Sequence, residues 1–140
     1  MASKDGYLGN SNLKRTKVNI PWTKDQILEF QKCSEDPIHF IKTYIKIVNV
    51  DLGLIPFNLW PFQEEMIRLA VDERFVICKM PRQVGKTTTV AAMILWHVLF
   101  KENYSVAILA NKEKQAIEIL SRIQLAYEHL PKWLQQGIKE

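Results

Sequence analysis

The segment Met80–Thr88 (MPRQVGKTT) constrains this chain more than any other, because it combines a glycine, a lysine and a hydroxyl in direct succession. A loop that wraps phosphate oxygens must turn sharply and direct backbone N–H groups inward, and Gly85 supplies the backbone freedom for that turn. Lys86 would bring its charge to the β- and γ-phosphates, and Thr87 would offer its hydroxyl to Mg²⁺. The spacing therefore predicts a phosphate-binding loop.

The usual pattern opens with a glycine separated by four residues from the Gly-Lys pair, and Met80 stands at that position. A Gly-Lys-Thr tripeptide alone is common, so an ordinary strand–helix turn with a surface lysine is the alternative. The flanking sequence favours the phosphate loop, since an apolar run precedes it and a helix-compatible stretch begins at Lys86.

The order of the elements around the loop predicts the fold class. Phe75–Cys78 and Tyr104–Ala110 are short apolar runs of the kind found in buried strands. Helical stretches follow each of them, one at about Lys86–Phe100 and one from Asn111 to about Tyr127, before Pro131 ends the second. Strand, helix, strand, helix is typical of an α/β fold, so we expect a parallel sheet flanked by helices, as in P-loop NTPases.

A helical lead-in is expected before the loop. Thr23 and Gln26 have the spacing of a capping box, and Asp36 before Pro37 is a second helix start. The second helix is expected to bury one face, made by Ile38, Ile41, Tyr44, Ile45 and Val48. An extended segment with a turn at residues 51–53 and a third helix near Pro61 should follow.

Charge and composition separate residues 1–22 from the rest of the chain. The chain is 47% hydrophobic and carries a net charge of +4, and residues 1–24 hold five basic side chains against one acidic one. That difference, 5 − 1 = +4, leaves the remainder neutral. We therefore expect residues 1–22 to be a flexible basic arm and residues 23–140 to be one domain, without a basic groove.

Other site classes are disfavoured. Cys33 and Cys78 have no metal-ligand spacing, which favours reduced thiols in a cytosolic protein, and the three histidines are scattered. The longest apolar run, Val90–Phe100, is too short to span a membrane, and no signal peptide is expected. Arg122 and the lysines of the last helices are expected to be solvated surface charges.

The loop sequence PRQVGKTT resembles the variant phosphate loop of bacteriophage terminase large subunits, above all those of T-even-type phages. Leu59–Gln63 resembles the adenine-recognition segment of that family, and Val106–Asn111 resembles the strand and polar cap after the loop helix. Residues 130–138 resemble the segment that follows the next helix. The resemblance covers roughly residues 25–140 and implies the front part of an ATPase motor domain.

The resemblance also implies roles for individual residues. Gln63 would read the adenine of ATP, and Arg82 would stabilise developing charge during catalysis together with Lys86. The nucleotide and its Mg²⁺ would be held by the loop residues Gln83, Val84, Gly85, Lys86, Thr87 and Thr88, with Thr87 on the metal. The alternatives are a surface glutamine at 63 and a non-catalytic contact at 82.

No apolar run after the loop ends in an acidic pair, and no segment supplies the carboxylates of the family's DNA-cutting domain. We therefore expect the chain alone to be catalytically incomplete. A whole subunit would hydrolyse ATP to package double-stranded DNA into a procapsid in the host cytoplasm. Its partners would be a small terminase subunit, the portal protein and further copies of itself. No association with a membrane is expected. The alternatives are another P-loop ATPase or helicase, and a non-catalytic interaction module that keeps the loop as a remnant.

Overall fold

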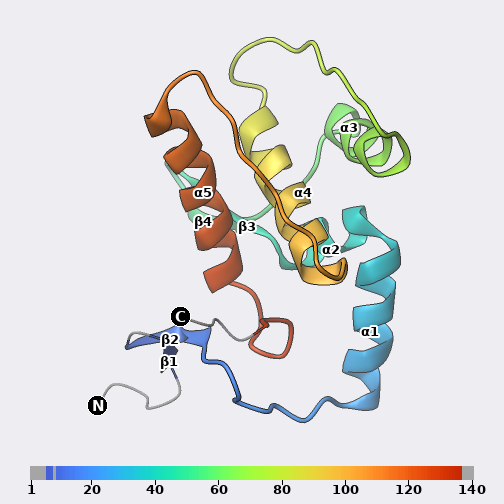
Figure 1. Ribbon diagram of the computed structural model, residues 1–140, viewed down its shortest axis with the longest axis vertical. Helices are drawn as coiled ribbons and strands as arrows, with labels where there is room; N and C mark the ends of the chain where they lie inside the picture. The colour runs from blue at the N-terminus through green and yellow to red at the C-terminus, as the bar shows by residue number, and fades with distance from the viewer. Residues whose placement is uncertain (1–5, 8, 137–140) are drawn as a thin grey trace.

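The computed structural model describes residues 6–7 and 9–136, which form five helices and two small antiparallel sheets (Figure 1). In chain order the elements are β1 (Gly6–Tyr7), β2 (Asn10–Lys14), α1 (Lys24–Glu35), α2 (Pro37–Tyr44), β3 (Lys46–Asn49), β4 (Gly53–Pro56), α3 (Pro61–Asp72), α4 (Lys86–Phe100) and α5 (Glu113–Glu128). Within this part of the chain no helix is long and apolar enough to cross a membrane.

Both expected starts of the first two helices are confirmed. The Thr23 hydroxyl accepts a hydrogen bond from the Gln26 amide at 3.3 Å, and the Gln26 side chain accepts one from the Thr23 amide at 3.0 Å. The Asp36 carboxylate caps α2 by accepting from the amides of Ile38 and His39. These side chains satisfy N–H groups that have no partner within the helix.

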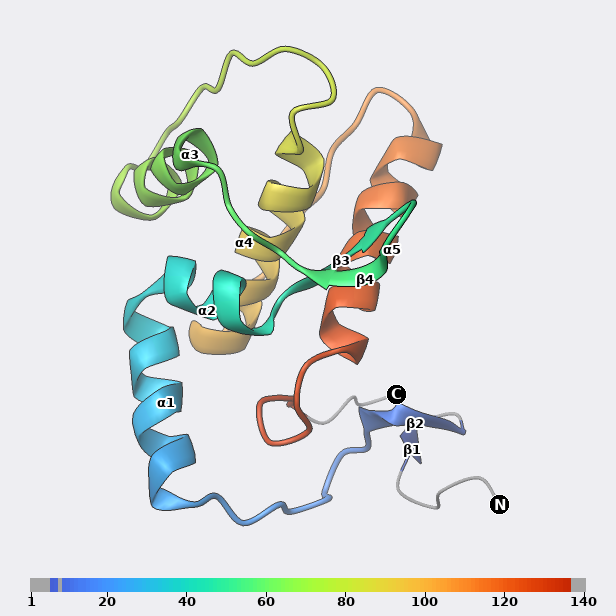
Figure 2. The ribbon, with the colours of Figure 1, turned by 180° about the vertical axis from the view of Figure 1, so that it is seen from behind.

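The C-terminal end expected for α2 is wrong. The helix ends at Tyr44, and Val48 lies in β3 with 64% of its surface exposed, so it does not belong to the buried face. β3 pairs with β4 around the expected turn, where the Asn49 side chain accepts from the amides of Asp51 and Leu52. The hairpin lies across α4 and α5 on the side seen in Figure 2.

The core lies between α1, α2, α4 and α5, with α4 at its centre. Trp96 on α4 is 1% exposed, and its indole N–H donates to the Cys33 carbonyl of α1 at 2.7 Å. The other side chains that fill the core are apolar, namely Cys33, Ile38, Phe40, Ile41, Ile45, Phe57, Leu59, Ile67, Ala92, Leu95, Leu99, Ala126, Leu130 and Leu134. This core holds α4 rigidly, and therefore fixes the place where the loop begins its helix.

A polar cluster on Glu29 joins α1 to α2. One carboxylate oxygen of Glu29 lies 2.7 Å from His39 Nε2 and accepts hydrogen bonds from the Tyr44 hydroxyl at 3.2 Å and the Cys33 thiol at 3.6 Å. The hydrogen bond from His39 is the main reason that the pKa of Glu29 lies below its ordinary value. Burial raises the pKa of the Cys33 thiol to about 12. Cys33 and the exposed Cys78 are both free thiols.

The expectation of a flexible arm differs from the structure for the part of residues 1–22 that is described. β1 and β2 pair in an antiparallel hairpin, which lies near the C-terminal end of α5 (Figure 1). Gln135, only 2% exposed, accepts from the Lys14 amide at 2.9 Å and donates to the Asn12 carbonyl at 2.9 Å. A buried amide therefore attaches this segment to the domain. The expected arm residues 1–5 and 8 lie outside the described part.

The expected parallel sheet is absent from the described residues. Residues 75–78 and 104–110 are extended but pair with no strand, and both sheets that do form are antiparallel pairs. Phe75, Ile77 and Leu109 are 83%, 98% and 92% exposed, although strands of a parallel sheet are normally covered on both faces. An apolar run becomes a strand only when a neighbour completes its ladder, and neither run has such a neighbour here. The fold shown is therefore a mixed one of helices and small antiparallel sheets.

Candidate phosphate loop and base pocket

The segment between α3 and α4 makes a tight turn as it reaches α4. Gly85 has φ +77° and Gln83 has φ +62°, so both lie in the left-handed region, where only glycine is unstrained. The Gly85 carbonyl then accepts from the Thr89 amide at 3.0 Å and from the Thr89 hydroxyl at 2.9 Å. This turn directs the chain into α4, so the first amides of the helix lie at the loop.

Gln63 on α3 fixes the loop from the other side. Its side chain is 3% exposed, its oxygen accepts from the Trp60 amide at 2.9 Å, and its nitrogen donates to the Val84 carbonyl at 3.3 Å. A Cβ at position 85 would lie 2.7 Å from that nitrogen. Gly85 is thus required twice, once for its backbone angle and once for the close approach of Gln63.

A pocket of about 920 Å³ opens beside this contact, and we call it the Gln63 pocket. One wall comes from β3, β4 and the start of α3, and the other comes from the loop and α4. The aromatic rings of Trp60 and Phe62 are 66% and 39% exposed, so both have faces available for stacking. The lining residues are uncharged, namely Ile47, Asn49, Ile55, Pro56, Phe57, Asn58, Leu59, Trp60, Phe62, Gln63, Gln83, Val84, Gly85 and Thr88.

Lys86 and Thr87 lie on a different side of the loop. Both line a second pocket of about 410 Å³, which we call the Lys86 pocket. Val76 and Cys78, from the segment between α3 and the loop, also line it. The Lys86 ammonium donates to the carbonyls of Met80 at 3.1 Å and Pro81 at 2.7 Å, which closes the loop around it. An incoming phosphate would have to compete with these two carbonyls for the ammonium group.

Arg82 is exposed, and it has no hydrogen-bond or ion-pair partner among the described residues. No carboxylate lines either the Gln63 pocket or the Lys86 pocket. Glu64, which follows Gln63 on α3, is paired with Lys42 and Arg68. Among the described side chains that line the Lys86 pocket, only Thr87 carries an oxygen that could bind a metal ion.

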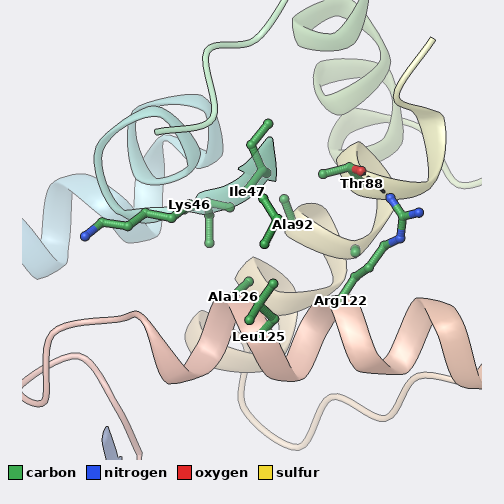
Figure 3. Close-up of a pocket in the computed structure, with 10 residues that line it drawn as sticks. Lys46, Ile47, Thr88, Ala92, Arg122, Leu125 and Ala126 are labelled. Atoms are coloured by element: carbon green, nitrogen blue, oxygen red, sulfur yellow. Dashed lines mark hydrogen bonds between the residues drawn. The ribbon is translucent and has the colours of Figure 1, made fainter. Parts of the chain in front are cut away.

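One residue at the loop was missed by the reasoning from sequence. Arg122 on α5 is exposed, as expected, but it also donates from Nη1 to the Thr88 hydroxyl at 2.7 Å, so this surface charge has a partner at the loop. The two side chains meet at one end of a smaller cavity of about 290 Å³ between β3, α4 and α5 (Figure 3). The two residues are 34 positions apart, and no spacing rule connects positions that only the packing of α5 on α4 brings together.

The structure thus brings Gln63, Gln83, Val84, Gly85 and Thr88 to one pocket, and places Lys86 and Thr87 at the next. Residues 77–137 match the model of a family described as terminase large subunit, T4likevirus-type, N-terminal. The match begins in the extended segment before the loop and includes the loop, α4 and α5, which confirms the resemblance read from the loop sequence. The family suggests a subunit of a DNA packaging motor. Over residues 77–137, this chain is therefore similar to the N-terminal part of T4-like terminase large subunits.

Proposed function

We propose that this chain binds ATP with Mg²⁺ at the turn between Met80 and Thr88, as the nucleotide-binding part of a DNA packaging ATPase. The observation that carries the proposal is the contact between Gln63 and the loop at Gly85. It brings a pocket that is large enough for a base, with exposed aromatic faces, against the first turn of α4. Helix N-termini attract phosphate because their amides are unpaired and the helix dipole is positive there.

Adenine would lie in the Gln63 pocket. The Gln63 nitrogen has two hydrogens, of which the Val84 carbonyl takes one, and its oxygen has a lone pair left after the bond from Trp60. One donor and one acceptor remain, which match the amino group and a ring nitrogen of an adenine edge. Trp60 and Phe62 would stack on the base.

The phosphates would follow the loop amides from Gln83 to Thr88. Lys86 would leave the two carbonyls that it now contacts for the β- and γ-phosphates, and Thr87 would bind Mg²⁺. Arg82 has a free guanidinium that would neutralise charge at the γ-phosphate during hydrolysis. These are the roles that the family resemblance assigns.

The extended apolar runs at residues 75–78 and 104–110 would be strands of a parallel sheet when further strands pair with them. Their exposed apolar side chains support this proposal, because a sheet face would bury them. The complete motor would move double-stranded DNA into a procapsid at its portal in the host cytoplasm. It would work there as an oligomer, with the portal protein and a small terminase subunit.

The test is thermal unfolding with and without Mg²⁺-ATP. A ligand at 100 times its Kd stabilises a folded protein by about 2.7 kcal/mol, which corresponds to roughly 8 °C for a domain of this size. We expect such a rise in the wild type, its loss in Lys86→Ala, and no loss in the matched control Lys114→Ala, an exposed lysine of α5. No rise in a cooperatively unfolding wild type would support the non-catalytic interaction module instead.

A further inference from the structure

The hydrogen bond between Arg122 and Thr88 joins α5 to the first turn of α4. Arg122 Nη1 lies 2.7 Å from Thr88 Oγ1, and Arg122 Nη2 lies 2.7 Å from Glu118 Oε1. Figure 3 shows the guanidinium at the Thr88 end of the cavity, with the stem of Arg122 leading back to α5. The ion pair with Glu118 is one turn away on the same helix, so it orients the guanidinium and balances its charge.

The chemistry of the two groups fixes the direction of this bond. A guanidinium donates and has no acceptor, so the Thr88 oxygen must accept. The hydroxyl hydrogen of Thr88 is therefore directed elsewhere, and within the described part of the chain no acceptor takes it. Thr89 is the contrast, because its hydroxyl donates to the Gly85 carbonyl inside the helix.

Thr88 lines the Gln63 pocket as well as the cavity beside Arg122, so a nucleotide in the Gln63 pocket would lie next to this residue. A phosphate oxygen accepts hydrogen bonds and cannot donate them, so a threonine can bind it only as a donor. An unconstrained hydroxyl rotates between donating and accepting arrangements. Arg122 restricts that freedom by occupying one of the two lone pairs of the oxygen.

We propose that Arg122 is a positioning residue that fixes the Thr88 hydroxyl as a hydrogen-bond donor to a phosphate oxygen of a bound nucleoside di- or triphosphate. In this role Arg122 acts through Thr88, which its Nη1 contacts, while its Nη2 is paired with Glu118. This inference rests on the proposed nucleotide site. It assigns a role on α5, which lies outside the loop and carries no phosphate-binding pattern.

The experiment measures Kd by calorimetry for ADP, ATP and adenosine. Arg122→Met keeps an apolar stem against Leu125 and Ala126 of the cavity but removes the donors. We expect Kd for ADP and ATP to rise about tenfold, the equivalent of one hydrogen bond of about 1.4 kcal/mol, and Kd for adenosine to stay unchanged. Arg122→Lys, which still donates, should restore most of the affinity.

The decisive comparison is a double-mutant cycle with Thr88→Val, which has the shape of threonine without its hydroxyl. If Arg122 acts through that hydroxyl, Arg122→Met has no further effect on Kd in the Thr88→Val background. A tenfold loss that persists there would overturn the inference, since it means direct contact with phosphate. An equal loss for adenosine would also overturn it, because it means general damage to the pocket.

The same measurements distinguish the role of Arg122 from the existence of the nucleotide site. A wild type that binds ADP and an Arg122→Met variant that binds it equally well would remove the role of Arg122 and leave the nucleotide site intact. A folded wild type that binds none of the three ligands would remove both. Glu118→Gln serves as the matched control, since it removes the ion pair with Arg122 but leaves the bond to Thr88, and a change well below tenfold is expected.

Discussion

Replacing Gly85 by alanine tests the contact on which the candidate site depends. The residue has φ +77°, and a side chain in the left-handed region costs about 1–2 kcal/mol. The added Cβ would also lie 2.7 Å from Gln63 Nε2, so the amide must move and lose its bond to Val84, at a cost of about 1 kcal/mol. We expect Gly85→Ala to lower the free energy of unfolding by roughly 2–3 kcal/mol.

Gly53→Ala is the matched control for the backbone part of this cost. Gly53 has φ +72°, nearly the same angle, and a Cβ there would meet no atom within 4 Å. Urea unfolding of both variants should show a loss at Gly53 of about 1–2 kcal/mol, with a further loss of about 1 kcal/mol at Gly85. The denaturant slope should stay that of the wild type.

The contact with Gln63 can be removed in a second step. In a Gln63→Ala background the Cβ at position 85 has space, so the cost of Gly85→Ala should fall to that of Gly53→Ala. Equal losses of unfolding free energy for Gly85→Ala and Gly53→Ala in the wild-type background would contradict this contact. They would mean that Gln63 does not lie against the loop. The Gln63 pocket would then not adjoin the place where the phosphates are expected.

Three further predictions concern other contacts. The carboxylate of Glu29 has a pKa below its ordinary value of 4.5. Its stabilising effect is therefore present above pH 4.5 and is lost as the pH falls through the lowered pKa. Glu29→Gln should be less stable than wild type at neutral pH, and the difference in unfolding free energy should shrink in acid. Gln83→Gly should raise the urea midpoint, with a gain of about 0.5–1 kcal/mol in unfolding free energy, because glycine adopts φ +62° without strain. An unchanged or lower midpoint would contradict the presence of strain at this residue. Gln135→Ala removes the buried amide that holds β2, so trypsin should cut after Lys14 and Arg15 faster than in wild type, while equal cleavage rates would count against that attachment.

Local signals in the sequence predicted the helices well. Thr23 and Asp36 cap helices at the expected places, since a cap acts over three or four residues, and Pro61 is the first residue of α3, a position that proline favours. The prediction for the last helix was less accurate, because Lys112 and not Asn111 is its N-cap residue. The position of Gly85 at the turn into α4 also followed from the loop pattern.

Long-range features could not be read in the same way. The apolar run at 75–78 has the composition of a strand, but a strand also needs a partner, which no local pattern supplies. The attachment of β2 by Gln135 and the bond from Arg122 to Thr88 join residues more than thirty positions apart. Their polar side chains looked like ordinary surface groups because burial and partner are properties of the packed molecule.

A crystal structure of this chain with Mg²⁺-ADP would test the proposed nucleotide site most directly. We expect the base in the Gln63 pocket and the β-phosphate at the first turn of α4. The Lys86 ammonium should then have left the carbonyls of Met80 and Pro81, which it now contacts at 3.1 and 2.7 Å, for the phosphate. A nucleotide bound at another place, or a Lys86 that keeps both carbonyl contacts beside bound ADP, would contradict this expectation.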